Sequence, residues 1–315
     1  MTEHNVQDTD DGIRLDRWFK RHFPYITHGL LEKSLRKGDI RVNGKKAKAS
    51  DRVVTGQVIS SRISDADAKE SASHRPVIQK AAPQISDQDI AMIQDAVLYK
   101  DADVIIINKP SGLAVQGGSK VTKSVDGLLD VLRYEAKERP KLVHRLDRDT
   151  SGVLVLARSA KAATRLGHIF AGKEAEKIYW ALVKGTPEVA QGKIDLPLAK
   201  QEEGDFEKVT IDKEDGKRAV TMYQVLERLS KTMAWVELQP ITGRMHQLRV
   251  HMAAIGHPII GDGKYGGRDA FIDGMELSHK LHLHARRIVI EDMGIDVTAP
   301  LPKHMQESWK KLGLD

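Results

Sequence analysis

The apolar positions near the start of the chain predict two short helices. Leu15, Trp18 and Phe19 recur at the spacing of one helix face, so a first helix is expected there. A second helix is expected over residues 29–37, where leucines gather on one side and Gly38 supplies a helix stop. The basic residues between these apolar positions would face water.

A hairpin is predicted directly after the second helix. Residues 40–42 alternate apolar and polar side chains, as a strand does, and the dipeptide Asn43-Gly44 is a strong turn signal. Residues 45–54 would begin the return strand. The order is therefore helix, helix, hairpin, and we place this first domain at residues 13–62.

A polar segment follows the first domain. Residues 64–89 are rich in Ser, Ala, Asp, Gln and Lys and contain two prolines. This composition is typical of a linker that is at least partly disordered. We place the linker at residues 63–94 and a second domain at residues 95–315.

The second domain combines many strand patterns with few helical ones. Such a succession favours an α+β fold, with a mixed, mainly antiparallel sheet and flanking helices, over regular alternation of strands and helices. The predicted helices cover residues 121–136 and 159–172, and Ser159 is placed to cap the second of them. The predicted strands are residues 104–107, 153–157, 178–183, 219–226, 233–238 and 283–290.

Charge is concentrated in the first domain. The whole chain carries a formal net charge of +6. Residues 14–62 hold 13 basic and 4 acidic side chains, a local excess of +9, which leaves the remainder near −3. Because no apolar face accompanies this charge, a nucleic acid is a better partner than an anionic membrane.

The composition also excludes several kinds of chemistry. The chain has no cysteine, so disulfides, thiol catalysis, iron–sulfur clusters and cysteine-bound zinc are ruled out. The first twelve residues lack the basic and apolar regions of a secretion signal, and no apolar run reaches a membrane span. We therefore expect a cytoplasmic protein without a membrane partner.

The most informative polar segment is His144 to Gly152, which runs straight into the apolar residues 153–157. A charged loop is thus delivered by a buried strand, as in many active sites. Two carboxylates, Asp147 and Asp149, alternate here with two arginines. A sheltered carboxylate beside a cation can act as nucleophile or base, but these residue types alone fit a structural ion pair or a capping Asp equally well.

A second polar cluster covers residues 242–251 and follows the strand that ends near Pro240. If it begins a helix, His246 and Arg249 lie on one face. His246 and His251 are five residues apart and have no nearby carboxylate, so structural or RNA-facing histidines are favoured over a metal site. No metal site is predicted.

Two familiar nucleotide-binding patterns fail. Residues 112–120 contain glycines and a lysine, but Gly117 is followed by Gly118-Ser119, where a phosphate-binding loop requires Lys and Ser or Thr. The segment beginning at His144 also differs from a kinase catalytic loop, because its Asp is displaced by one position and no metal-binding segment follows.

Residues 144–152 resemble the signature of the RluA-type pseudouridine synthases. Other segments that are similar to motifs of this family occur in the expected order, at residues 108–112, 177–179, 242–251 and 256–262. The resemblance covers about residues 97–314. It implies an isomerase that converts uridine in RNA to pseudouridine without a cofactor.

The resemblance also implies roles for individual residues. Asp147 would be the catalytic aspartate and Arg249 its ion-pair partner. Tyr179 would stack on the target base, and Arg145 would enter the RNA helix where that base had been. The carboxylate would either attack the sugar or remove the proton at its 2′ carbon, and the sequence leaves both routes open.

The first domain resembles the small RNA-binding domain of ribosomal protein S-four. The resemblance rests on the helix-helix-hairpin order and on residues 37–44 and 56–59. It implies that the basic side chains of this domain contact RNA. These are Arg14, Arg17, Lys33, Arg36, Lys37, Arg41, Lys45 and Lys46.

Within the family, the added first domain, Asn108 and the loop of residues 114–119 resemble the RluC type, which modifies large-subunit (23S) ribosomal RNA. That RNA, or its assembly intermediates, is therefore the expected partner. Three alternatives stay open: a transfer RNA substrate, a catalytically silent RNA-binding or ribosome-assembly factor, and a nucleoside or glycoside hydrolase. The hydrolase would need two carboxylates placed around a water.

Overall fold

A computed structural model describes residues 2–63, 85–117, 123–203, 206–229, 231–272 and 274–314. These residues form two compact units, one on each side of residues 64–84, and each unit is described by itself. Most of the predicted linker lies outside the described residues. None of the helices in the described ranges is both long and apolar enough to cross a membrane.

The first unit has the predicted order of two helices and a hairpin. Its elements are β1 (Thr2–Asn5), the 3-10 turn η1 (Asp8–Asp10), α1 (Leu15–His22), α2 (His28–Lys37), β2 (Ile40–Val42), β3 (Lys45–Lys46) and β4 (Val58–Ser61). The strands form an antiparallel sheet in the order β1-β4-β2-β3. The predicted start at residue 13 is wrong, because β1 pairs along its whole length with β4 and Val6 is buried in the core.

Local chemistry explains where the elements of the first unit begin and end. The Thr27 side chain accepts the Leu30 amide and so caps α2, and Gly38 ends this helix in the left-handed conformation. Asn43 and Gly44 both have positive φ, at 47° and 73°, as a two-residue type I′ hairpin turn requires. Leu15, Trp18 and Phe19 are buried together, as their spacing predicted.

The second unit begins earlier than predicted. Helix α4 (Asp87–Asp95) lies within the segment assigned to the linker. Ser86 and Asp89 form a capping box at its start, and Ile93 is fully buried against the rest of the unit. The error arose because the buried face of this helix carries few apolar residues among many polar ones.

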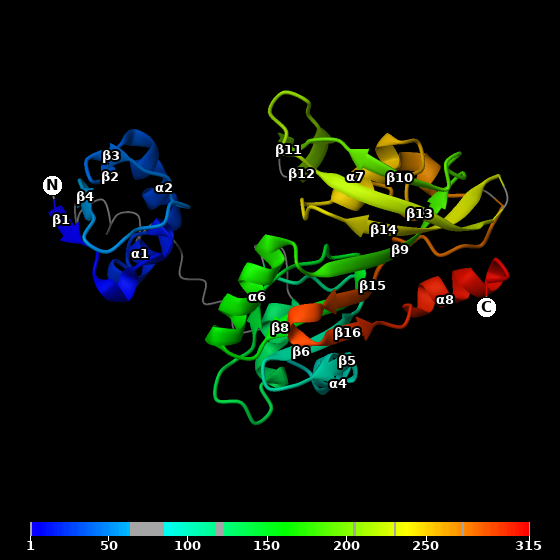
Figure 1. The fold of residues 1–315 in the computed structure, drawn as a ribbon, viewed down its shortest axis with the longest axis horizontal. Coiled ribbons are helices and arrows are strands. Elements are labelled where there is room, and N and C mark those ends of the chain that lie inside the picture. The colour runs from blue at the N-terminus through cyan, green and yellow to red at the C-terminus, as the bar shows by residue number, and fades with distance from the viewer. Residues whose placement is uncertain are drawn as a thin grey trace. The chain divides into compact units, whose positions relative to one another are not determined.

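The second unit is built on a ten-stranded, mixed and mainly antiparallel sheet, so the predicted α+β fold is confirmed (Figure 1). Along the main path the strand order is β10-β13-β14-β9-β15-β8-β6-β5, with β16 added to β15 and β7 to β8. Strands β11 and β12 form a separate ribbon. The strands are β5 (Val97–Lys100), β6 (Val104–Lys109), β7 (Lys141–Leu142), β8 (Ser151–Ala157), β9 (Glu176–Lys184), β10 (Gln191–Asp195), β11 (Leu198–Glu203), β12 (Phe206–Ile211), β13 (Val220–Arg228), β14 (Met233–Pro240), β15 (Leu283–Ile290) and β16 (Ile295–Thr298).

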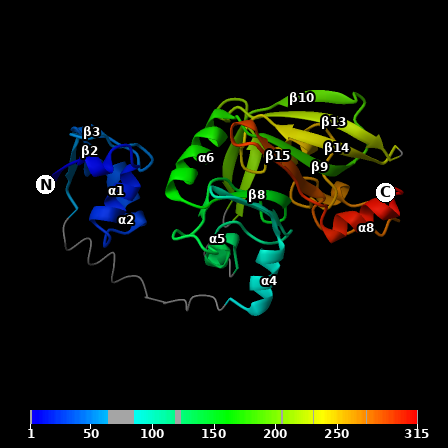
Figure 2. The same cartoon turned by 60° about the horizontal axis from the view of Figure 1, so that its bottom comes forward.

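Helices cover both faces of the sheet around β8 (Figure 2). Val153 and Val155 pack with the core beneath α6, whereas Leu154 and Leu156 pack with the core formed by α4 and α5. This alternation follows from the two-residue period of a strand, and it explains why β8 is a continuous apolar run. The remaining helical elements are α5 (Val125–Leu128), η2 (Leu129–Leu132), α6 (Ala160–Gly172), α7 (Gln247–Ala254), η3 (Gly267–Ala270), η4 (Glu291–Met293) and α8 (Lys303–Lys311).

The predicted helix over residues 121–136 is much shorter in the structure. Only α5 and the 3-10 turn η2 form, and residues 118–122 lie outside the described part. Helical geometry ends soon after Leu132, because Tyr134 adopts a left-handed backbone with φ of 47°. The helix predicted over residues 159–172 is confirmed, with the Ser159 side chain as its cap.

Candidate active site

The loop of residues 143–150 joins β7 to β8 and is fixed at its start by His144. The His144 ring stacks on Phe170, with 4.5 Å between ring centroids, and its Nε2 accepts the Val155 amide at 2.8 Å. Burial lowers the pKa of His144 to about 3, so the ring is neutral and can accept this hydrogen bond. His144 thus anchors the loop to β8.

A buried lysine fixes the other end of the loop. The Lys109 ammonium group is fully buried and donates to the carbonyls of Pro110, Leu113 and Arg148 at 2.8–3.0 Å. Burial lowers its pKa to about 8, partly offset by the nearby Asp149 and Asp147. The lysine therefore ties the loop after β6 to the loop that carries the candidate catalytic aspartate.

Gly152 lets this loop join the sheet next to β15. Its φ is 110°, and a Cβ atom there would lie 2.2 Å from the Ala285 carbonyl oxygen. A side chain at this position would force the two backbones apart. The close approach of the two backbones thus explains why the last residue of the signature segment, Gly152, is a glycine.

Asp147 lies between two basic side chains from the second polar cluster. Its Oδ2 is 3.7 Å from Arg249 Nη1, and its Oδ1 is 3.8 Å from His246 Nε2. The Asp147 side chain is 18% exposed, so one edge of the carboxylate remains open to a substrate. The structure therefore brings together Asp147 and Arg249, which the sequence had placed 102 residues apart.

Arg249 has a closer partner that the sequence did not identify. Its Nε and Nη2 donate to the two carboxylate oxygens of Asp262 at 2.8 and 2.7 Å, a bidentate geometry. Asp262 is 2% exposed, so this buried pair fixes the guanidinium beside Asp147. The segment of residues 256–262, which resembles a family motif, contains Asp262, but no role was predicted for it.

His246 is held by Tyr265 in a strained conformation. The predicted helix starts later than residue 242, because His246 itself is the residue before α7 and has a left-handed φ of 53°. Its Nδ1 lies 2.5 Å from the Tyr265 hydroxyl, which also accepts the Val209 amide. Burial and the cations of Arg249 and Lys264 lower the His246 pKa, against the opposing effect of Asp147. In the neutral ring, Tyr265 donates to Nδ1 and Nε2–H points to Asp147.

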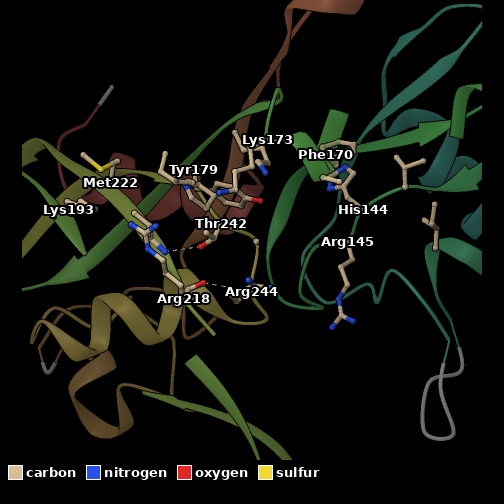
Figure 3. A pocket seen from close by; sticks show the side chains of 18 of the residues that line it. His144, Arg145, Phe170, Lys173, Tyr179, Lys193, Arg218, Met222, Thr242 and Arg244 are labelled. Carbon is tan, nitrogen blue, oxygen red and sulfur yellow. Dashed lines mark hydrogen bonds between the residues drawn. The ribbon is translucent and has the colours of Figure 1, made fainter. Parts of the chain in front are cut away.

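Tyr179 comes from β9 and shares a pocket of about 270 Å³ with Asp147. Burial raises its pKa, and the Asp147 charge acts in the same direction, so the phenol stays protonated. Arg145 is exposed and lies on the opposite side of the opening from Arg218 and Arg244 (Figure 3). Asp149 is 56% exposed and lies 4.0 Å from Arg148. It lines a neighbouring hollow that Asp147, His246 and Arg249 also border.

The structure gives His251 a structural role. Its Nδ1 lies 2.9 Å from the Thr221 hydroxyl and its Nε2 lies 3.0 Å from the Leu196 carbonyl oxygen. Among the residues that the structure describes, no three His, Asp or Glu side chains are grouped as a metal ion would require.

The basic residues proposed to bind RNA lie in the first unit. Seven of them are exposed, whereas Arg14 is half-buried and forms hydrogen bonds with the Asp16 carboxylate at 2.6 and 3.1 Å. Arg41 donates to the carbonyls of Gly38 and Gly44, so it supports the hairpin turn. The exposed side chains are Arg17, Lys33, Arg36, Lys37, Arg41, Lys45 and Lys46.

Known proteins are similar to this chain over most of its length. A family model described as RNA pseudouridylate synthase matches residues 103–254. A protein of Rickettsia bellii named ribosomal large subunit pseudouridine synthase C is 39% identical over 300 residues, covering 92% of this chain and 95% of that one. A protein of the same name from Vibrio cholerae is 33% identical and covers 98% and 96%.

A solved structure supports the α+β fold. Human RNA pseudouridylate synthase domain containing 4 matches with a TM-score of 0.60 and 28% identity, over 71% of this chain and 95% of that one. The signature loop, the order of the other motifs and relatives matched along nearly their whole length lead to one conclusion: the chain belongs to the RNA pseudouridylate synthase family.

Proposed function

We propose that this protein converts specific uridines of large-subunit (23S) ribosomal RNA to pseudouridine, with Asp147 as the catalytic residue. The observation that supports this most is the position of Asp147, which lines the same pocket as Tyr179 and lies between His246 and Arg249. The ribosomal substrate is supported by the names of the bacterial relatives that match along nearly the whole chain.

The proposed reaction breaks the bond from the sugar C1′ to uracil N1 and forms a bond from C1′ to C5. The C5 proton is lost and N1 gains one, so substrate and product are isomers and no cofactor is required. Asp147 begins the reaction either by attacking C1′ or by taking the proton from C2′. Arg249 attracts one carboxylate oxygen and His246 the other, which orients the carboxylate toward the pocket.

The target base has to leave its stack to reach this pocket. Extruding a base costs a few kcal/mol. Stacking on an aromatic side chain contributes roughly 1–3 kcal/mol, and Tyr179 is the aromatic ring beside Asp147. In this proposal the exposed Arg145 guanidinium, two residues before Asp147 on the same loop, occupies the space that the base leaves.

The first unit serves as an additional RNA-binding domain in this proposal. Its exposed lysines and arginines would neutralise phosphates of the same ribosomal RNA or of its assembly intermediates. A cytoplasmic location follows from this proposed substrate in a bacterial cell, where the relatives compared above are found.

The proposal is tested by incubating purified protein with transcripts of large-subunit ribosomal RNA and of transfer RNA, and by measuring pseudouridine by mass spectrometry. The wild type should modify the ribosomal transcript, and Asp147→Asn should form no product while still binding RNA. Asp149→Asn is the matched control, because it removes an exposed carboxylate of the same loop and should retain activity.

Product in transfer RNA alone would replace the ribosomal substrate with the alternative one. Full activity of Asp147→Asn would overturn the proposed chemistry. Release of free uracil would indicate a hydrolase, and binding of RNA without modification by the wild type would indicate a silent RNA-binding factor.

A further inference from the structure

A large groove continues from the pocket of Asp147 across the sheet. Its volume is about 1010 Å³, against about 270 Å³ for the pocket itself. The two hollows share lining residues, among them Arg145, Tyr179 and Thr242. From there the groove passes over β13 and reaches Lys193 on β10 (Figure 3). A polymeric ligand that enters the pocket can therefore extend directly into the groove.

The charge of this groove fits a polyanion. Six cationic side chains line it, and no Asp or Glu is found among its described lining residues. The cations are Arg145, Lys173, Lys177, Lys193, Arg218 and Arg244. A hollow lined by one sign of charge concentrates the field and attracts ligands of the opposite sign.

The far end of the groove holds two cations that share one acidic partner. Asp195 lies outside the lining and contacts both Lys193 Nζ and Arg218 Nη2 at 3.1 Å. Arg244 in turn donates to the Arg218 carbonyl at 3.3 Å. The Arg218 side chain is 73% exposed and that of Lys193 is 50% exposed, so both can still reach a phosphate.

The floor of the groove is apolar, which distinguishes unpaired from paired nucleotides. Phe170, Val220, Met222 and Ile241 line it, and Met222 and Ile241 are each 38% exposed. Unpaired bases present apolar faces that can pack on such a floor, whereas a duplex hides these faces in its stack. A floor of this kind beside a cationic rim is the arrangement that binds single-stranded nucleic acid.

We propose that this groove binds the unpaired nucleotides that adjoin the target uridine on one side. Their phosphates contact Lys193, Arg218 and Arg244, and their bases pack on Met222 and Ile241. The inference rests on the proposed function, and it deepens it: the enzyme selects uridines in loops or bulges, where a neighbouring stretch is unpaired.

The test measures binding in the Asp147→Asn background, so that chemistry does not disturb the equilibrium. The probes are a stem-loop RNA with one uridine in its loop and a fully paired duplex of the same stem. Lys193→Gln combined with Arg218→Gln should weaken stem-loop binding and leave duplex binding unchanged. Because each single-strand phosphate contact contributes about 0.7 to the slope of log K against log salt, losing two contacts should lower the slope by about 1.4.

The floor is tested separately by Met222→Gln. This change should weaken stem-loop binding without altering the salt slope, because no charge is removed. The matched control for the cation pair is Lys303→Gln with Lys310→Gln, which removes two exposed charges from α8 outside the groove and should leave the salt slope unchanged. Thermal unfolding of each variant verifies that it is folded.

Three outcomes would overturn the groove proposal. Equal losses for stem-loop and duplex would show that the groove holds paired RNA, and equal losses in the α8 control would show a general charge effect. Displacement by polyglutamate with no effect of the groove variants on RNA binding would assign the groove to an acidic polypeptide. These outcomes can be distinguished from failure of the proposed function. In that case the wild-type protein would bind the stem-loop but form no pseudouridine in it.

Discussion

At the scale of single residues, Asp147 depends on side chains that do not touch its open edge. Asp262 fixes Arg249 through two hydrogen bonds, and Tyr265 fixes His246 through one. The two fixed side chains then face different oxygens of the Asp147 carboxylate. The geometry of the candidate site is thus set by the buried Asp262 and the half-buried Tyr265.

Asp262→Asn should weaken both folding and catalysis. The buried Arg249 would keep a hydrogen-bond partner of similar shape but lose its closest opposite charge, which should cost about 3 kcal/mol in the free energy of unfolding. A displaced guanidinium should also lower kcat, on the order of 100-fold, because the reaction requires accurate orientation. Urea unfolding and single-turnover pseudouridine formation measure the two effects. Wild-type turnover in a destabilised variant would show that Arg249 does not orient Asp147.

Tyr265→Phe should lower kcat and leave KM unchanged. The phenylalanine keeps the ring that lies beside Arg249 but removes the donor to His246 Nδ1. Loss of a hydrogen bond of about 1 kcal/mol would lower kcat roughly fivefold.

The pH profile tests the same hydrogen bond. Protonation of His246 in the wild type would reverse it, because Nδ1–H would then donate to the Tyr265 oxygen. Burial lowers the His246 pKa below the ordinary histidine value of about 6.5. Wild-type kcat should therefore be constant at neutral pH and fall only in acid. A rise in KM with unchanged kcat in Tyr265→Phe would instead indicate a contact of Tyr265 with RNA.

At the scale of elements, the site is assembled by loops that β6 and β8 hold side by side. Lys109 at the end of β6 donates to three carbonyls, one of which belongs to Arg148 next to Asp147. His144 anchors the other end of the same loop to β8. The catalytic loop is therefore fixed at both ends by buried side chains.

Lys109→Met should release one of these ends. The Arg148 carbonyl would keep the Gly112 amide as a donor, but the Pro110 and Leu113 carbonyls would lose the Lys109 ammonium group. Each unsatisfied group costs about 1–3 kcal/mol, so the free energy of unfolding should fall by about 2 kcal/mol or more. Lys310→Met is the control, since Lys310 is exposed on α8. Chemical denaturation measures both, and equal small losses would contradict the anchoring role of Lys109.

The elements that could be predicted from sequence are those with strong local signals. β8 contains a continuous apolar run, and α6 has both its periodicity and its Ser159 cap. α4 was not predicted because its buried face carries few apolar residues. The helix over residues 121–136 was predicted too long, because no Gly or Pro near Tyr134 indicates that this residue adopts a left-handed backbone.

The candidate site was likewise predicted in part: its motifs can be recognised in the sequence, but the contacts between them cannot. Asp147, Tyr179 and Arg249 lie in recognisable motifs, but their meeting depends on strand pairing across the sheet. β9 pairs with β15, and β15 pairs with β8, which carries the Asp147 loop. Asp262 lies in the segment of residues 256–262 that resembles a family motif, and Tyr265 lies outside the motifs. Only the folded chain identifies these two residues as the partners of Arg249 and His246.

At the scale of the whole molecule, buried histidines make stability depend on pH. Burial lowers the pKa of His144 to about 3 and those of His282 and His284 to about 4. Between pH 4 and the unfolded value of about 6.5, the unfolded chain binds protons that the native protein does not. Stability is therefore present above pH 6.5 and is lost as the pH falls toward 4.

Urea unfolding at pH 7 and pH 5 measures this loss. Each such histidine contributes a slope of up to about 1.4 kcal/mol per pH unit. His284→Gln should reduce the pH dependence, because it removes one of the three groups. An unchanged free energy of unfolding between pH 7 and pH 5 would show that these histidines are protonated in the native protein.

Charge is the other property of the whole molecule that bears on function. The first unit supplies exposed cations, and the groove beside Asp147 supplies another set. Lys45→Gln with Lys46→Gln should weaken binding to ribosomal RNA and lower its salt dependence, since phosphate contacts release counterions. RNA filter binding over a range of salt concentrations measures this, and an unchanged salt slope would mean that these lysines are simply solvated.

The most direct test of the central claim is pseudouridine mapping of ribosomal and transfer RNA from cells that lack this protein. Cells complemented with the wild type are compared with cells complemented with Asp147→Asn. We predict that sites are lost from large-subunit ribosomal RNA and restored only by the wild type. A map that is unchanged by removal of the protein, or one that Asp147→Asn restores in full, would contradict the account.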